Sequence, residues 1–433
     1  MYQRMDRFGV VPPDILREIL KLLPDLHTLQ NLRRASPAVN SLLHEDGPAA
    51  EIVESIISSN LAYPTQFKVR LIALLVWGPD GHNILLESPN DLRDTLWGPR
   101  RENPPERAKH RDTVGRRFLT RYTGLPSAVL VRVVTLAGQV HQLAHRCFHT
   151  LLARVLASQP RRPTDPTLTN REYTHSVNAA VRARAPFPLP GPAPESELVP
   201  FPPAATASPS WGEARRFEAD SWEYALQAIL LHLPSGPVTL ARQKSIGQIF
   251  QPPEHHIPAW INYGTLKECL PKQPMRLSEA INILPAVQHP CCQGDPLFDH
   301  HEEWKPPEYV EQDRLLVPLD RYINRTWLIS PMKHEQWSPI FQADLHDFDH
   351  LGFLVWCRKR MAALGFMAHD DEETRRNRVA GGPMQGNWPC RNAIYSDLLA
   401  CRSVMSARQV EIMQERSRRW WADNVLHAPP RGT

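Results

Sequence analysis

The amino-acid sequence predicts a mainly α-helical protein, and three observations support this. Apolar residues recur at helical spacing through most of the first 157 residues and again towards the C-terminus. Proline, serine and aspartate stand where those helices would begin. The 43 prolines, about twice the average usage, break the chain into short elements. We expect three short N-terminal helices, an irregular helical region, a Pro-rich linker and a helical C-terminal domain.

The first predicted helix begins at Val11-Pro12-Pro13-Asp14, because proline is tolerated in a first helical turn and an acidic side chain suits its dipole. Leu16, Ile19, Leu20 and Leu23 then follow at the spacing of one apolar helix face, which the preceding Ile15 widens. Pro24 ends this helix.

Two further short helices follow in the same segment. Asp25 can cap a helix that carries Leu26, Leu29 and Leu32 three residues apart. Ser36-Pro37 is a second start signal, with serine as the cap and proline at the first helical position. The third helix carries the apolar residues Val39, Leu42 and Leu43.

The rest of the chain divides by composition. Helical patterns continue over 49–157, interrupted by a basic stretch at 100–121, and residues 125–156 form one or two helices. Residues 158–210 are dense in proline and predict a linker or disordered loop. Residues 211–433 are predicted as a mostly helical domain, with helices near 211–230, 351–366 and 393–424. No internal repeat is present, which excludes the common repeat architectures.

Overall composition narrows the class of protein. The 433 residues are 42% hydrophobic and 22% charged, as in a globular protein of two or three domains. A formal net charge of +4 does not predict a nucleic-acid partner. Seven cysteines without a CxxC pair predict a reduced protein of the cytoplasm or nucleus. We find no signal region or membrane span in the sequence, so no membrane partner is expected.

Residues 11–43 resemble the F-box consensus, and the domain that contains them would span residues 8–48. Val11 stands for the usual leucine and Asp14 for the usual glutamate. The likeness is greatest to fungal F-box-domain proteins, which share the second-helix phrase seen here at 25–37. They also share a segment seen at 210–216 (Ser-Trp-Gly-Glu-Ala-Arg-Arg) and one at 351–360, where the position of Cys357 is often acidic.

The resemblance implies a non-catalytic adaptor in protein degradation. Such a protein would bind a Skp-type adaptor, and through it the cullin of an SCF-type ubiquitin ligase, and would present an unknown protein target through residues 211–433. The binding residues implied are Val11, Pro12, Ile15, Leu16, Ile19, Leu20, Leu23, Leu29, Leu32 and Ser36. Catalytic residues, metals and cofactors are not expected. Two alternatives stay open: the apolar face packs on residues 49–77 and meets no partner, or the protein acts outside a ligase.

Other patterns have weaker functional interpretations. His289, Cys291, Cys292 and the run Asp299–Glu303 could ligate zinc, but the spacing matches no structural zinc pattern and a surface loop is favoured. His346 and His350, four apart, could share a helix face in a metal-dependent enzyme. The basic stretch 100–121 could contact phosphates. Residues 15–43 could also form a helix-turn-helix that reads bases through Gln30, Asn31, Arg33 and Arg34.

Overall fold

The computed structural model describes residues 6–61, 63–77, 125–164, 179–185, 195–231, 338–353, 355–367 and 394–427, with a few single residues between 280 and 336. Within these residues the protein is mainly helical, as predicted, and the strands β1 and β2 have three residues each. The chain divides into two compact units. The first unit consists of Met1–Cys147 and Ala214–Trp304, and the second consists of Phe148–Glu213 and Lys305–Thr433. The unit boundaries fall inside two helices, α10 (Ser127–Ser158) and α13 (Trp211–Leu231).

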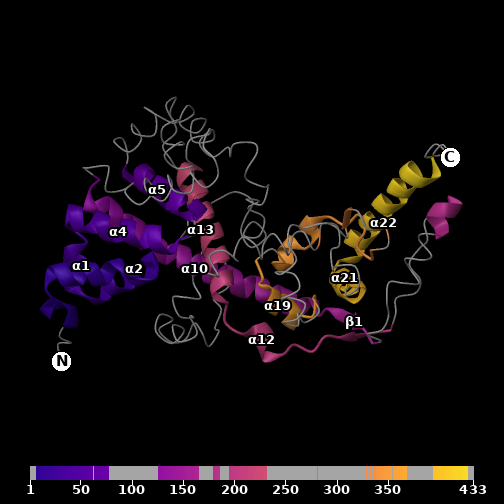
Figure 1. The fold of residues 1–433 in the computed structure, drawn as a ribbon, viewed down its shortest axis with the longest axis horizontal. Coiled ribbons are helices and arrows are strands. Elements are labelled where there is room, and N and C mark those ends of the chain that lie inside the picture. The colour runs from indigo at the N-terminus through magenta and orange to yellow at the C-terminus, as the bar shows by residue number, and fades with distance from the viewer. Residues whose placement is uncertain are drawn as a thin grey trace, which may run out of the picture. The chain divides into compact units, whose positions relative to one another are not determined.

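The first unit opens with the three predicted short helices. Asp25 caps the second, because its Oδ1 accepts a hydrogen bond from the Thr28 N–H at 2.7 Å. Ser36 caps the third, because its Oγ accepts from the Val39 N–H at 3.2 Å. The elements are the 3-10 turn η1 (Arg7–Val10), α1 (Pro13–Lys21), α2 (Leu26–Ala35), α3 (Pro37–Leu42), α4 (Asp46–Asn60) and α5 (Tyr63–Trp77). Helix α1 packs against α4, and α2 packs against α3 and α4, all drawn in indigo in Figure 1.

Two buried ion pairs hold α5 in this unit. The Arg70 guanidinium pairs with Glu54 of α4, and both side chains are almost wholly buried. Lys68 Nζ lies 2.9 Å from Glu223 Oε2 of α13. Removing one partner of such a pair would leave a buried charge unpaired, which is why these pairs fix which face of α5 turns inward.

The helix α10 is one continuous element. Its first turn is capped from the preceding helices, because the Ser127 N–H donates to Asp46 Oδ1 at 2.7 Å and the Ser127 hydroxyl donates to the His44 carbonyl at 2.9 Å. These bonds satisfy groups that a helix terminus would otherwise leave open.

In the second unit, both ends of the Pro-rich segment 158–210 are ordered. Strands β1 (Arg161–Pro163) and β2 (Ser196–Leu198) pair antiparallel, and the helical turn α12 (Pro203–Thr206) follows. Arg162 ties this ribbon to helix α21 (Ile394–Ser403) through an ion pair with Asp397, with 2.6 Å between Nη2 and Oδ1. The ribbon needs only three residues on each side, so it forms within a segment that is rich in proline. The linker or disordered loop predicted over 158–210 stays a prediction.

The predicted helix over 351–366 is wrong. The structure has the 3-10 turns η2 (Leu345–Asp347) and η3 (Asp349–Leu351), and the helix α19 covers only Arg358–Ala363. Gly352 lies between them with φ +75°, in the left-handed region, and a Cβ there would approach the Trp356 ring to 2.9 Å. The Trp356 indole N–H donates to the Leu351 carbonyl at 2.6 Å and so closes the turn.

The C-terminal helical stretch is confirmed as two helices. Helix α21 ends at Ser403, and α22 (Ala407–Trp421) begins after Ser406, which forms a capping box with Gln409. A π-helical turn, η5 (Ala422–Leu426), continues α22. Among the helices described, none is long and apolar enough to cross a membrane.

Candidate functional site

Helix α1 carries apolar side chains on two different faces, one buried and one exposed. On the inner face Leu16 and Leu20 are 2% and 0% exposed, against α4. On the outer face Ile15, Ile19 and Leu22 are 55%, 42% and 83% exposed. A single large apolar residue on a surface is ordinary, but several on one helix face form a patch that is typical of a protein-binding site.

The outer face continues at its N-terminal end. Pro12 is exposed, and positions 12, 15, 19 and 22 are spaced as one stripe of an α-helix. Val10, in η1, is 82% exposed near the start of the same helix. We call Pro12, Ile15, Ile19 and Leu22 the α1 stripe.

The charges along α1 pair with one another. Arg17 Nη2 lies 3.0 Å from Asp14 Oδ1, and Lys21 Nζ lies 2.9 Å from Glu18 Oε1 and 3.0 Å from Glu51 Oε2. The hydrogen bonds that Lys21 donates to Glu18 and Glu51 raise its pKa. A partner that covers the stripe would therefore meet charges that are already partly neutralised, so less free energy is needed to desolvate them.

The position of η1, just before α1, is fixed by Asp6 and Ser36. Asp6 Oδ2 accepts from the Ser36 hydroxyl at 2.8 Å and from the Ala38 N–H at 3.1 Å, and its Oδ1 accepts from the Phe8 N–H at 3.1 Å. The bond from Ala38 is the main cause that lowers the pKa of Asp6. Ser36 thus holds α3 and η1 together.

The residues that the sequence implied for partner binding fall into three groups. Pro12, Ile15 and Ile19 are exposed; Val11, Leu23 and Leu32 are half-buried; Leu16, Leu20, Leu29 and Ser36 are buried within the unit. Sequence reasoning missed Leu22 and Val10. Leu22 could have been found, because it follows Ile15 and Ile19 at seven and three residues.

The helix-turn-helix alternative meets an obstacle in α10. Gln30 of α2 is 7% exposed, and a Cβ at Gly138 of α10 would come within 3.3 Å of its side chain. Arg33 Nη2 donates to the Thr135 hydroxyl of α10 at 3.2 Å. A recognition helix must leave the face that reads bases open. In the structure α10 occupies that face of α2.

The metal alternatives gain no support from the described residues. His346 and His350 lie in separate 3-10 turns, and His346 Nδ1 contacts Asp349 Oδ2 at 2.6 Å. Within the ranges that the structure describes, no group of three His, Cys, Asp or Glu side chains is arranged to hold a metal ion. The 289–303 cluster and the basic stretch 100–121 lie outside those ranges.

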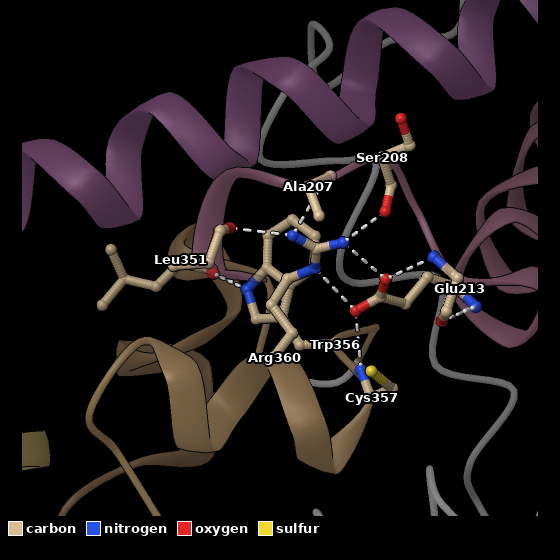
Figure 2. A network of polar contacts seen from close by, with 9 residues as sticks. Ala207, Ser208, Glu213, Leu351, Trp356, Cys357 and Arg360 are labelled. Carbon is tan, nitrogen blue, oxygen red and sulfur yellow. Dashed lines mark hydrogen bonds and ion pairs between the residues drawn. The ribbon is translucent and has the colours of Figure 1, made fainter. Parts of the chain in front are cut away.

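A buried polar network joins residues 210–216 to residues 351–360. Figure 2 shows Glu213, from 210–216, opposite Arg360, from 351–360. Glu213 Oε1 accepts from Arg360 Nε at 2.9 Å and from the Cys357 N–H at 2.9 Å. Its Oε2 accepts from Arg360 Nη2 at 3.0 Å and from the Ser210 N–H at 2.9 Å.

The rest of the Arg360 guanidinium binds backbone carbonyls. Nη1 donates to Ala205 at 2.8 Å and Ala207 at 3.1 Å, and Nη2 donates to Ser208 at 2.8 Å. The guanidinium also lies 5.0 Å from the Phe148 ring centre. With five bonds, the donors of one guanidinium are all used. We therefore interpret this network as structural: it fixes the start of α13 and the segment before it, and it leaves no donor for a ligand.

Burial and pairing act against each other at Glu213. Burial alone would raise the pKa of its carboxyl, but the charge and hydrogen bonds of Arg360 outweigh burial and lower that pKa. The carboxylate therefore stays ionised, as a structural anchor should.

Comparison of the chain with protein-family models, curated proteins and solved structures found no match.

Proposed function

We propose that the protein is a non-catalytic substrate-receptor subunit of an SCF-type cullin–RING ubiquitin ligase. The observation that carries the proposal is the α1 stripe, which stays exposed while another face of the same helix, with Leu16 and Leu20, is buried. The resemblance of residues 11–43 to the F-box adds the identity of the partner, a Skp-type adaptor. The cytoplasm or nucleus, where such ligases act, belongs to the same proposal.

The packing of α1 answers one objection to this function. A helix whose whole apolar surface packed on α4 would have nothing left for a partner. Here Leu16 and Leu20 serve the core, so docking through Ile15, Ile19 and Leu22 does not require α1 to leave α4. An amphipathic helix of this kind suits a hydrophobic groove, which its anchors enter at positions three and four apart.

The energetics require more than the stripe alone. Each aliphatic side chain that becomes buried contributes roughly 1.5–3 kcal/mol, whereas association costs about 4–15 kcal/mol. Three aliphatic anchors and one proline are therefore near break-even. Flanking contacts from Val10, and from the charged side chains beside the stripe, would supply the surplus. In the proposed complex ubiquitin transfer is performed by other subunits, and this chain contributes proximity.

The test is capture of a recombinant Skp-type adaptor by the full chain. The double variant Ile15→Asp/Ile19→Asp should weaken binding about 100-fold or more, because two charges would be buried in an apolar groove. Both positions are exposed, so the thermal unfolding temperature should hold. Ile412→Asp is the matched control, since Ile412 is 42% exposed, as Ile19 is, but lies on α22.

Retained capture by the double variant would overturn the proposal. The alternative of an F-box-like protein outside a ligase has its own signature. In that case the adaptor binds through the α1 stripe, but purified cullin fails to join the complex.

A further inference from the structure

A short segment of the Pro-rich region lies against the end of the last long helix. Residues 179–185 form one helical turn, and Ala180 packs with Trp421 of α22 and Val425 of η5. These three are 8%, 1% and 8% exposed. Val181, Ala185 and Trp420 surround them. We call Trp420, Trp421 and Val425 the tryptophan seat.

The segment ends in a recognisable helix-stop motif. The Ala185 N–H donates to the Ala180 carbonyl at 2.9 Å, and the Arg184 N–H donates to the Val181 carbonyl at 3.3 Å. These are the two bonds of a Schellman motif, in which the residue before the last adopts the left-handed conformation. That residue is Arg184, with φ +49°. Glycine is the usual residue there, because a Cβ is disfavoured in that conformation.

The tryptophan seat contacts both the side chains and the backbone of residues 179–185. The Trp421 indole N–H donates to the Ala185 carbonyl at 2.9 Å, which satisfies a donor that a buried tryptophan needs. Phe341 stabilises the tryptophan seat through two contacts. Its carbonyl accepts a hydrogen bond from the Ser417 hydroxyl of α22 at 2.9 Å, and its ring packs edge-on against Trp420 with the ring centres 5.1 Å apart.

Residues 179–185 and the tryptophan seat differ in the size of their side chains and in backbone conformation. The seat consists of two tryptophans and a valine on a well-held helix. The occupant contributes small side chains and places an arginine where the conformation favours glycine. The internal segment buries the seat, and a segment with glycine at the left-handed position would do so without the conformational cost of Arg184.

We infer that the tryptophan seat binds a helical segment of a target protein, and that residues 179–185 are an internal occupant which the target displaces. The inference rests on the proposed function, because it assigns the target site of a substrate receptor. The chemistry of the target follows from the occupant: a small residue, an aliphatic residue next to it, and a closing left-handed residue followed by a second small one. Glycine or asparagine at the left-handed position would improve the fit.

Residues 179–185 would compete with an added peptide for the tryptophan seat, and this competition determines the peptide binding that can be measured. A segment of the same chain competes intramolecularly, so its effective concentration does not depend on how dilute the protein is. Residues 179–185 should therefore suppress binding of a free peptide in the natural chain. Substituting the buried alanine of the occupant should remove that suppression without touching the seat.

The probe is a fluorescent synthetic peptide of residues 176–186 that carries Arg184→Gly, and the readout is its anisotropy with the full chain. The chain variant Ala180→Asp should bind this peptide about tenfold or more tightly than the natural chain does. The matched control is Ala179→Asp, the same change one residue earlier at an exposed position. It should behave as the natural chain does. Equal binding by all three chains would overturn the inference.

A second measurement covers the case in which Ala180→Asp fails to fold. In the natural chain, an unlabelled peptide with Arg184→Gly should compete with the probe about tenfold better than the peptide with arginine, because only glycine accepts the left-handed conformation without cost. Equal competition by the two peptides would also overturn the inference. Adaptor capture is measured on the same samples, so that a failure of the seat and a failure of the α1 stripe are distinguished.

Discussion

Two buried charge clusters include residues of α13 that are two to five positions apart, and the clusters differ in their balance of charge. Around Glu213 and Arg360 every guanidinium donor has an acceptor and the carboxylate accepts four bonds. Around Arg215, one guanidinium faces two carboxylates: Arg215 Nη1 lies 2.6 Å from Glu218 Oε2, and Asp25 also interacts with its charge. The first cluster is matched in charge, whereas the second carries an excess of carboxylate.

The pKa directions follow this difference. At Glu213 pairing outweighs burial and the pKa falls. At Glu218 burial, together with the charge of Asp25, outweighs Arg215 and the pKa rises. Burial alone would raise the pKa of Asp25. The charge of Arg215 and the hydrogen bond from the Thr28 N–H outweigh burial, so the pKa of Asp25 is lowered. The carboxylate of the matched cluster thus favours its ionised form, whereas one carboxylate of the unmatched cluster, Glu218, is shifted towards its neutral form.

Histidines add to the second cluster. The rings of His27 on α2 and His141 on α10 stack with centroids 3.9 Å apart and an angle of 9°. The pKa of His141 is lowered to about 3: burial is the largest cause, the charge of His27 follows, His145 and Arg215 act in the same direction, and Asp25 opposes them. His141 is therefore neutral in the stack at neutral pH.

The largest expected effect tests the matched cluster. Arg360→Met should destabilise the protein by about 3–5 kcal/mol, because it leaves the Glu213 carboxylate buried without its partner and three carbonyls without a donor. Urea denaturation measures the free energy of unfolding. The control Lys359→Met, next to it on α19 but exposed, should change that free energy by less than about 0.5 kcal/mol. A loss below about 1 kcal/mol for Arg360→Met would show that the network contributes little.

The next effect tests the unmatched cluster through its pH dependence. The unfolded chain takes up a proton at His141 near pH 6.5 and the folded chain only near pH 3, so stability is present above 6.5 and is lost as the pH falls. From pH 6.5 to 5 the loss should approach about 2 kcal/mol, at 1.36 kcal/mol for each pKa unit. Glu218 acts in the opposite sense: its pKa is raised, so its contribution falls as the pH rises above 4.5.

His141→Gln should remove most of the stability loss between pH 6.5 and 5, because glutamine does not titrate. The measurement is the free energy of unfolding in urea at several pH values. His427→Gln, at an exposed position of the C-terminal turn, should leave the pH slope as it is in the natural protein. An unchanged slope in His141→Gln would show that the stacked pair does not control the acid response.

Sequence reasoning could predict elements whose signals are local. The starts of α1, α2 and α3 follow from Pro13, Asp25 and Ser36, each of which acts within three residues. It failed at 351–366, because the left-handed turn at Gly352 depends on the Trp356 side chain that covers it. The helical apolar pattern runs through the whole stretch, but only Arg358–Ala363 form an α-helix.

The site residues show the same limit. Periodicity placed apolar residues on α1, but both Leu16 and Ile15 fit it, and only packing on α4 decides which faces the core. The Glu213–Arg360 pair spans 147 residues, so no local spacing could reveal it. The segments 210–216 and 351–360 drew attention only as likenesses to a family, and their contact explains why a glutamate and an arginine stand in them.

The smallest expected effect separates capping from ion pairing within the matched cluster. The Glu213 N–H donates to Ser210 Oγ at 3.3 Å, so Ser210→Ala removes one cap of α13 while the bonds of the Glu213 carboxylate to Arg360 remain. The expected loss in the free energy of unfolding is about 1 kcal/mol. Ser406→Ala, which breaks the equivalent capping box of α22, should cost a similar amount, because its Oγ accepts from the Gln409 N–H at the same 3.3 Å. If Ser210→Ala instead cost as much as Arg360→Met, cap and ion pair would form one cooperative unit, and the contrast with the second cluster would lie in that cooperativity rather than in matched charge.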